Sequence, residues 1–226
     1  MIYGVSDLHL DATKEKDMCV FGRAWENYEE KIFQKWAQTV QEKDTVLIPG
    51  DISWAMTLRS ADRDLMRLDA LPGRKILLRG NHDYWWQSLK QNQQAGYRSL
   101  SFLQNNAFVV ENTRIVGTRG WASPDSAEFK EADRKIFQRE IIRLNLSFDS
   151  KTEPYTRTVC MLHYPPFLKD GTLNEIGQTV RDRGADVCIY GHLHASGLQW
   201  VREGIIEGVQ FRCLSGDYID FQPIEI

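Results

Sequence analysis

The sequence has few cysteines, and none of them form the close pairs that bind zinc or act in redox exchange. Its four cysteines, Cys19, Cys160, Cys188 and Cys213, lie far apart, and no C-x-x-C motif occurs. The last three lie in apolar segments, where a free cysteine behaves as a small hydrophobic residue. We therefore expect a protein with reduced cysteines, located in the cytoplasm.

Long apolar runs and an excess of positive charge are also missing. No segment approaches the ~20 apolar residues that a membrane-spanning helix needs. The 28 lysines and arginines are outnumbered by 31 aspartates and glutamates, which gives a net charge of −3. Because duplex-binding proteins usually carry a basic excess, long nucleic acid is not favoured as a partner. No basic segment followed by an apolar one opens the chain, so we expect no cleaved signal peptide and no membrane segment.

Short apolar segments alternate with longer amphipathic ones, a pattern typical of α/β proteins. Six apolar segments are expected to form buried strands: Met1–Ser6, Thr45–Pro49, Lys75–Arg79, Arg114–Thr118, Thr158–Leu162 and Asp186–Tyr190. After Gly197 the pattern predicts three short antiparallel strands, with a turn at Glu203-Gly204. These strands are Leu198–Arg202, Ile205–Glu207 and Val209–Leu214.

Apolar residues at three- and four-residue steps predict three helices between the strands. The first covers about Arg23–Glu42, and the second covers Leu58–Leu71, before Pro72-Gly73. The third follows Ser123-Pro124 and is expected to cover one face of a sheet, or to act as a lid or dimer contact. Its apolar stripe consists of Phe129, Ile136, Phe137, Ile141 and Leu144. We find no repeat or linker, and residues 1–226 are expected to form a single domain.

Polar residues of the types that bind metals follow five of the predicted strands. The motifs are Asp7-Leu8-His9, Gly50-Asp51, Gly80-Asn81-His82-Asp83, His163 and Gly191-His192-Leu193-His194. Ligands of α/β proteins bind beyond the carboxyl ends of the strands, so these side chains are expected to lie together. All five histidines of the chain belong to these motifs. The glycines before Asp51, Asn81 and His192 are expected to permit sharp turns there.

The composition of these motifs points to a metal site. Neighbouring carboxylates repel one another and imidazoles titrate near neutral pH, so such a cluster needs a cation to organise it. Nitrogen and oxygen ligands without thiolates suit manganese, iron, zinc or cobalt. The residues are too many for one ion but enough for two ions that share a carboxylate, an arrangement suited to phosphoryl transfer.

In order and spacing, the five motifs resemble those of the calcineurin-like metallophosphoesterases. The resemblance implies a four-layer αββα sandwich of two mixed β-sheets flanked by helices, in which a hydroxide held by two metal ions attacks phosphorus in line. One ion would be bound by Asp7, His9, Asp51 and His194, and the other by Asp51, Asn81, His163 and His192, with Asp51 bridging. His82 would contact the phosphate or protonate the leaving oxygen.

The sequence departs from the family pattern after Gly50-Asp51. Many members carry an acidic residue three positions after this aspartate, but here that position is Trp54. The missing acid disfavours the protein serine/threonine phosphatases. A tryptophan cannot coordinate iron as the tyrosine of the purple acid phosphatases does, so a tyrosinate–iron site is not expected. Asp83, next to His82, is a candidate to orient it but could point elsewhere.

The small phosphorylated substrate is expected to be a phosphodiester or a nucleotide, slightly ahead of a phosphomonoester, and large aromatic residues near the motifs could contact it. They are expected either to stack on a flat group or to pack the helices onto the sheets, and they comprise Trp54, Tyr84, Trp85, Trp86 and Trp121. Three arginines, Arg59, Arg79 and Arg119, are candidates to contact a phosphate oxygen.

Three alternatives to a small-molecule phosphoesterase remain open at this stage. A nuclease of the same family would show a steep salt dependence of binding. A hydrolase of lipid-linked diphosphates would need an apolar lid, for which the helix after Ser123-Pro124 is the one candidate. A non-catalytic metal-binding scaffold would usually have lost some ligands, whereas here every motif is complete.

Overall fold

Two β-sheets pack face to face in the computed structural model, which describes all 226 residues. The first sheet has the strand order β11-β1-β2-β3-β4, and the second has the order β5-β6-β7-β8-β10-β9. The first comprises β1 (Ile2–Gly4), β2 (Thr45–Ile48), β3 (Arg74–Leu78), β4 (Leu100–Leu103) and β11 (Ile224–Glu225). The second comprises β5 (Phe108–Val110), β6 (Thr113–Thr118), β7 (Arg157–Leu162), β8 (Val187–Tyr190), β9 (Gly204–Ile206) and β10 (Val209–Cys213).

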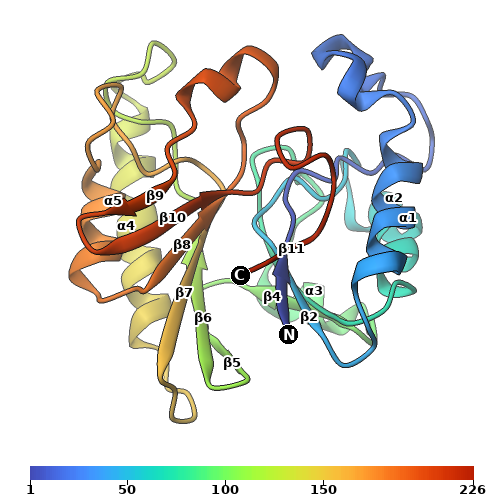
Figure 1. Cartoon of the computed structure of the whole chain (residues 1–226), viewed down its shortest axis with the longest axis horizontal. Coiled ribbons are helices and arrows are strands. Elements are labelled where there is room, and N and C mark those ends of the chain that lie inside the picture. Colours follow the sequence, from blue (N-terminus) through green and yellow to red (C-terminus); the bar gives the residue numbers. More distant parts are fainter.

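Both sheets are mixed: their central strands are parallel, and antiparallel strands lie at one edge of the first sheet and at both edges of the second, while the other edge strand of the first sheet, β4, is parallel to β3. Strand β11 is antiparallel to β1, and β5 and β9 are antiparallel to β6 and β10. Helices α1 (Tyr28–Thr39) and α2 (Leu58–Asp69) lie outside the first sheet, and α4 (Asp133–Asp149) and α5 (Glu175–Asp182) lie outside the second (Figure 1). A short helix, α3 (Leu89–Gln94), precedes β4. The predicted four-layer sandwich is therefore confirmed.

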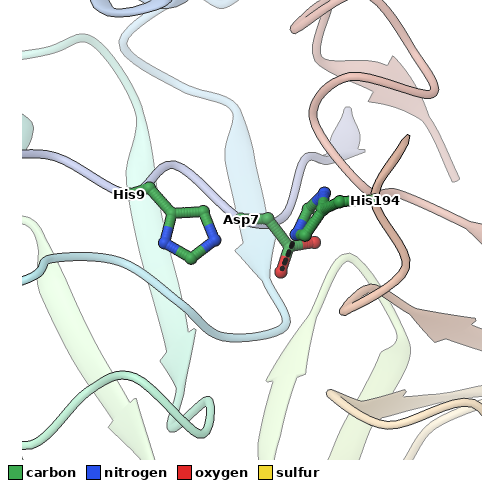
Figure 2. Close-up of side chains that lie close together, drawn as sticks. All are labelled: Asp7, His9 and His194. Carbon is green, nitrogen blue, oxygen red and sulfur yellow. Dashed lines mark ion pairs between the residues drawn. The ribbon is translucent and has the colours of Figure 1, made fainter. Parts of the chain in front are cut away.

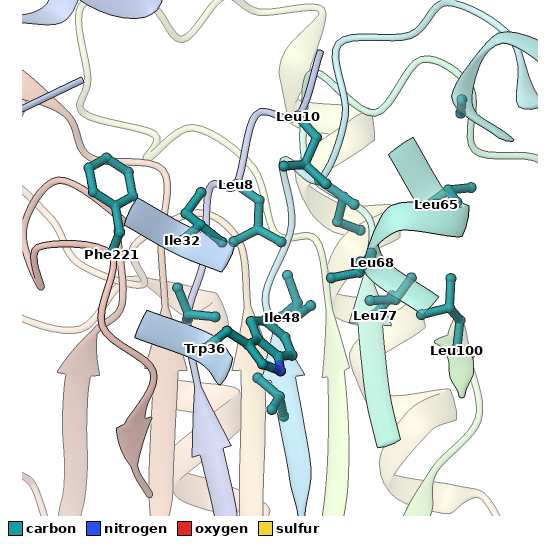
Figure 3. Close-up of a cluster of buried hydrophobic side chains, with 14 of the residues drawn as sticks. Leu8, Leu10, Ile32, Trp36, Ile48, Leu65, Leu68, Leu77, Leu100 and Phe221 are labelled. Atoms are coloured by element: carbon teal, nitrogen blue, oxygen red, sulfur yellow. The ribbon is translucent and has the colours of Figure 1, made fainter. Parts of the chain in front are cut away.

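Alternating side chains of the central strands enter two different cores. In β2, Ile48 faces the core beneath α1 and α2 (Figure 3). Val46 belongs to the same core, whereas Leu47 enters the core between the sheets. In β7, Cys160 faces α4 and α5, whereas Val159 enters the core between the sheets. Burial on both faces explains why these strands appear in the sequence as continuous apolar runs.

The buried cysteines follow the expected pattern. Cys160, Cys188 and Cys213 are buried in strands, Cys19 is exposed, and all four are free thiols. No helix combines the length and the apolar character that crossing a membrane requires.

Two predicted helices begin later than expected. Arg23–Trp25 forms only a 3-10 turn, η2, and α1 starts after Asn27, whose left-handed backbone (φ 54°) interrupts the helix. Ser123-Pro124 does not begin the third helix, because Ser123 bonds to Asp125 and α4 starts at residue 133. Helix α4 packs on β6, in agreement with the prediction that it covers a sheet.

One predicted strand is wrong. The segment Leu198–Arg202 instead lies largely in the 3-10 helix η3 (Ala195–Trp200). A separate 3-10 turn, η1 (Met18–Phe21), lies near the start of the chain. Within η3, Leu198 is only partly buried and Trp200 is exposed on the wall of a cleft. The hairpin turn between β9 and β10 lies at Glu207-Gly208, where both residues have positive φ, not at Glu203-Gly204.

Candidate metal centre

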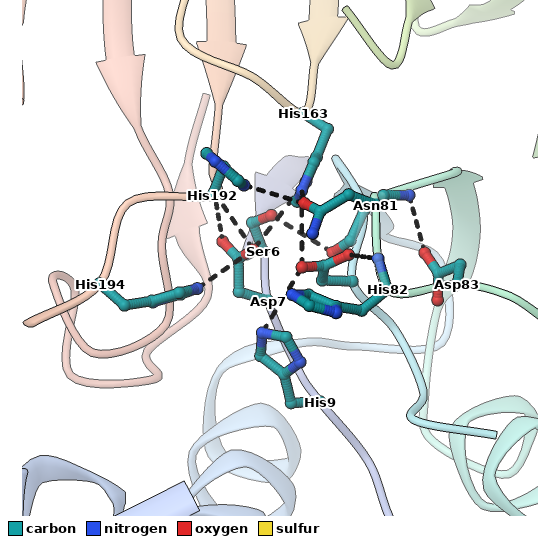
Figure 4. A network of polar contacts seen from close by, with 12 residues as sticks. Ser6, Asp7, His9, Asn81, His82, Asp83, His163, His192 and His194 are labelled. Carbon is teal, nitrogen blue, oxygen red and sulfur yellow. Dashed lines mark hydrogen bonds and ion pairs between the residues drawn. The ribbon is translucent and has the colours of Figure 1, made fainter. Parts of the chain in front are cut away.

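The loops that follow five parallel strands bring all the predicted ligand residues together between the two sheets (Figure 4). Each strand contributes one or two of them: Asp7 and His9 after β1, Asp51 after β2, Asn81 after β3, His163 after β7, and His192 and His194 after β8. Asp7, His9, Asp51 and His163 are buried, and the others are partly buried. His82 lies next to these residues, with its ring 5.7 Å from that of His9 (Figure 4).

Four of these residues hold a strained backbone. Asp7, His9, Asp51 and His192 all have positive φ values, between 43° and 75°. Such conformations are uncommon for residues other than glycine and tend to persist at functional sites, where the surrounding structure enforces them. The backbone at these positions is therefore shaped to aim side chains into the centre.

Gly80 and Gly191 allow neighbouring loops to approach one another closely. This role differs from the sharp turns expected at these two glycines. A Cβ atom at Gly80 would lie 2.1 Å from the carboxylate of Asp51. A Cβ atom at Gly191 would lie 2.5 Å from the carboxylate of Asp7. Any larger residue at either position would displace a predicted metal ligand.

Asp7, His9 and His194 form one candidate ligand group (Figure 2). His194 Nε2 lies 3.5 Å from Asp7 Oδ1, and His9 Nε2 lies 3.6 Å from Asp51 Oδ2. Both ring nitrogens of His9 and Nε2 of His194 are buried without a hydrogen-bond partner. Buried polar atoms are rarely left unsatisfied, so this group fits a cation that would take one lone pair from each histidine.

A second cluster of predicted ligands consists of Asn81, His163 and His192. Asn81 Oδ1 lies 2.6 Å from His163 Nε2 and 2.9 Å from His192 Nδ1. His163 Nδ1 lies 3.0 Å from the carbonyl oxygen of Pro49, which can only accept a hydrogen bond. The proton of a neutral His163 is therefore on Nδ1, and its Nε2 lone pair faces the amide oxygen. Two acceptors this close also fit a cation between them.

The ionisation of the side chains in the centre also supports binding of a cation. Burial lowers the pKa of His163 to about 4, so this ring is neutral at pH 7. Burial, and then the charges of Asp83 and Asp7, raise the pKa of Asp51 well above its usual range. Asp51 Oδ2 lies 3.5 Å from His163 Nε2, and Asp7, Asp51 and His163 form a further candidate ligand group. A cation would offset the cost of holding the Asp51 carboxylate ionised.

Asp217, which belongs to none of the five sequence motifs, positions His194. The ring nitrogen Nδ1 of His194 donates to Asp217 Oδ1 at 2.8 Å, and the Asp217 carboxylate also accepts from the backbone of Ala195. This bond leaves Nε2 directed at Asp7. Burial lowers the pKa of His194, but the charges of Asp7 and Asp217 raise it to about 10. The missed signal is that Gly216-Asp217 follows β10, as Gly50-Asp51 follows β2.

Replacing Asp217 by asparagine is expected to weaken metal binding by about 10–100-fold, the usual loss when a carboxylate behind a histidine ligand is removed. Asparagine keeps an oxygen near Nδ1, so the fold should be unchanged. Competition with a coloured chelator measures the affinity. Asp220→Asn is the matched control, because Asp220 pairs with Lys35 near the surface. Equal affinities in Asp217→Asn and the control would contradict the positioning role.

Asp83 does not orient His82. Its carboxylate accepts hydrogen bonds from the backbone of Ile52, Ser53 and Gly80 and from the Trp85 indole. Asp83 therefore ties the loop after β2 to the loop after β3. The ring of His82 packs against Trp54, with the ring centroids 4.4 Å apart, and hydrogen-bonds to no protein group.

A cleft of about 650 Å³ opens from the centre toward the loops after β6, β7 and β8. Its walls include His82, His192 and His194, together with the exposed rings of Phe21 and Trp200. The Phe21 ring lies 6.1 Å from that of His194. Most of the aromatics expected to contact a substrate lie elsewhere. Trp85 and Trp86 are buried in the core, Trp54 stacks on His9, and Trp121 packs on Arg119.

Comparison with known proteins agrees with this architecture. The sequence profile of the calcineurin-like phosphoesterases matches residues 1–196. The chain belongs to this family. An uncharacterized protein of Methanocaldococcus jannaschii is 29% identical over 102 residues, which are 44% of this chain and 56% of that protein. The chain thus spans about half the length of this curated relative.

Solved structures share the calcineurin-like fold. A protein of unknown function from Aquifex aeolicus has a TM-score of 0.54 and 21% identity, over 99% of this chain and 94% of that one. The phosphopantetheinyl hydrolase of Mycobacterium tuberculosis has a TM-score of 0.54 and 12% identity, over 95% and 88%. At these identities the likeness shows the fold alone. Family membership and the candidate ligand groups together support a metal-dependent phosphoesterase.

Proposed function

We propose that the chain hydrolyses a small phosphate ester, with phosphodiesters and nucleotides preferred, using two transition-metal ions. The observation that carries this proposal is the convergence of seven ligand residues beside a large cleft, with unsatisfied buried nitrogens on two of them, His9 and His194. Asp7, His9, Asp51 and His194 would hold one ion, and Asp51, Asn81, His163 and His192 the other. Bound ions there would supply an activated water and positive charge for the phosphoryl oxygens.

Other roles in the reaction are proposed for the shared ligand, for His82 and for two exposed aromatic residues. Asp51 Oδ2 lies between His9 and His163, one histidine from each proposed ion, which supports it as the shared ligand. The ring of His82 lines the cleft and has no protein partner, so it is available to the leaving oxygen of the substrate. We propose that the organic group lies along Phe21 and Trp200, which are 41% and 46% exposed and can contact a flat or apolar group.

Removing the metals is expected to abolish hydrolysis reversibly. The protein is first treated with a chelator, and manganese, iron, zinc, nickel or magnesium is then added back before assay. The substrate panel contains bis-p-nitrophenyl phosphate, p-nitrophenyl phosphate, nucleotides and a phosphopantetheinyl ester. We expect restored activity with at least one transition metal and faster hydrolysis of diesters than of monoesters.

Each other outcome of this experiment has a definite meaning. Activity that survives complete metal removal would contradict the metal-dependent mechanism. Two bound ions per chain without hydrolysis of any ester would favour a binding scaffold. Preference for oligonucleotides, with a steep salt dependence, would favour the nuclease alternative.

A further inference from the structure

A second pocket lies beside the metal centre and contains none of the proposed ligands. It has a volume of about 50 Å³ and lies where the ends of β3 and β4 in one sheet meet the end of β6 in the other. Three arginines, Arg79, Arg119 and Arg143, line it together with a single carboxylate, that of Glu140. The pocket therefore has an excess of two positive charges over negative ones.

Two of these arginines, Arg79 and Arg119, have a buried Nε–H group with no hydrogen-bond acceptor. Arg79 takes part in no ion pair, and its Nε atom is buried without a hydrogen-bond acceptor. Arg119 Nε is also buried and unsatisfied, and the nearest carboxylate oxygen, on Glu140, lies 3.8 Å from its guanidinium group. Buried guanidinium groups are normally paired with acceptors, so two unsatisfied ones in a single pocket indicate a missing anion.

Glu140 carries a single negative charge, which cannot balance three arginines, and each of its oxygens already accepts one hydrogen bond. One accepts a hydrogen bond from Arg143 at 2.7 Å and the other from Thr118 at 2.6 Å. The amide nitrogen of Gln104, which also lines the pocket, is a further donor, since the Gln104 oxygen accepts from Trp86. The pocket therefore presents mainly hydrogen-bond donors.

We infer that this pocket binds a phosphate-class oxyanion, with Arg79 and Arg119 as its principal contacts. A cavity needs roughly 10–15 Å³ for one water molecule, so this volume accommodates about four atoms of that size, the number of oxygens in phosphate. Guanidinium groups bind such oxygens through pairs of charge-assisted hydrogen bonds. The site is separate from the catalytic cleft, so an anion bound here leaves the proposed metal ligands free.

Calorimetric titration of inorganic phosphate into the metal-free protein tests this inference independently of the proposed activity. Chelation removes the other phosphate-binding position, so one site per chain is expected. Arg79→Gln should weaken binding by at least about tenfold, as expected for the loss of a hydrogen bond between charged groups. The exposed Arg59 provides the matched control, because Arg59→Gln makes the same change of charge outside the pocket. Glu140→Gln should strengthen binding, because it removes the only negative charge.

A second titration, with adenosine 5′-monophosphate, distinguishes two sources of the oxyanion. Binding of inorganic phosphate alone would assign the pocket to the free ion, whereas binding of both would assign it to a terminal phosphoryl group. Melting curves without phosphate check that Arg79→Gln is folded. No phosphate binding by the wild-type protein, or equal binding by Arg79→Gln and Arg59→Gln, would overturn the inference.

Discussion

Asp51→Asn is expected to abolish ester hydrolysis and to reduce metal binding at both proposed positions. The Asp51 carboxylate lies 3.6 Å from His9 and 3.5 Å from His163, which belong to the two different ligand sets. Loss of a carboxylate that only supports a ligand already costs about 10–100-fold in affinity, so loss of the shared ligand should cost more. Metal analysis by mass spectrometry should find less than one tightly bound ion per chain.

The same substitution should stabilise the metal-free protein. Burial and the neighbouring acids raise the pKa of Asp51, so folding disfavours its ionised form at neutral pH. Asparagine removes this charge and offers an amide group to the His9 and His163 nitrogens. Because a carboxyl group with a raised pKa lowers stability only above its usual value of 3.8, the gain should disappear below that pH. We therefore expect the melting temperature of the metal-free variant at pH 7 to exceed that of the metal-free wild type by at least about 2 °C. This difference corresponds to roughly 1 kcal/mol in a chain of this size.

Glu153→Gln is the control for this pair of effects, since Glu153 is exposed and forms no ion pair. It should change neither metal content nor melting temperature. Two tightly bound ions in Asp51→Asn would rule out the bridging role. A metal-free variant less stable than the metal-free wild type would show that the Asp51 carboxylate contributes structurally.

The sequence predicted the sheet centres better than the sheet edges. Central strands such as β2 and β7 are buried on both faces and therefore appear as unbroken apolar runs. Edge strands such as β11, which has two residues, are too short to show a recognisable pattern of apolar residues. The segment before β9 forms a 3-10 helix that ends at Trp200 on the wall of a cleft, and a short run containing apolar residues does not distinguish such a segment from a strand.

The sequence predicted the site residues that come directly after a strand. It did not predict a residue that acts by positioning another side chain. Asp7, Asp51 and His163 could be grouped because parallel strands end at one edge. The role of Asp217 depends on a contact between residues 23 positions apart, which spacing alone does not specify. The tryptophans near the motifs proved to be mainly core residues, because aromatic composition predicts burial as readily as binding.

His82→Ala is expected to lower kcat by about 10²–10⁴-fold for esters with alkyl leaving groups, the usual contribution of a positioned general acid. An alkoxide is a poor leaving group and needs a proton as the bond to phosphorus breaks. His82 can provide it, because its ring lines the cleft beside the centre and is not bonded to a protein group. Its backbone N–H, which holds Asp51 Oδ1 at 2.8 Å, is unchanged in the variant. Metal content should therefore equal that of the wild type.

The leaving group separates the roles that His82 can play. A p-nitrophenolate leaves without protonation, so a general acid predicts a much smaller loss for p-nitrophenyl esters than for alkyl esters. An equal loss for both classes would instead mean that His82 stabilises the phosphoryl oxygens electrostatically. Tyr84→Ala is the matched control, because Tyr84 is half-exposed, with its ring 6.3 Å from that of His82, and should alter both rates only slightly. If His82→Ala loses a metal ion, His82 is itself a ligand, and the proton must come from one of the other four histidines.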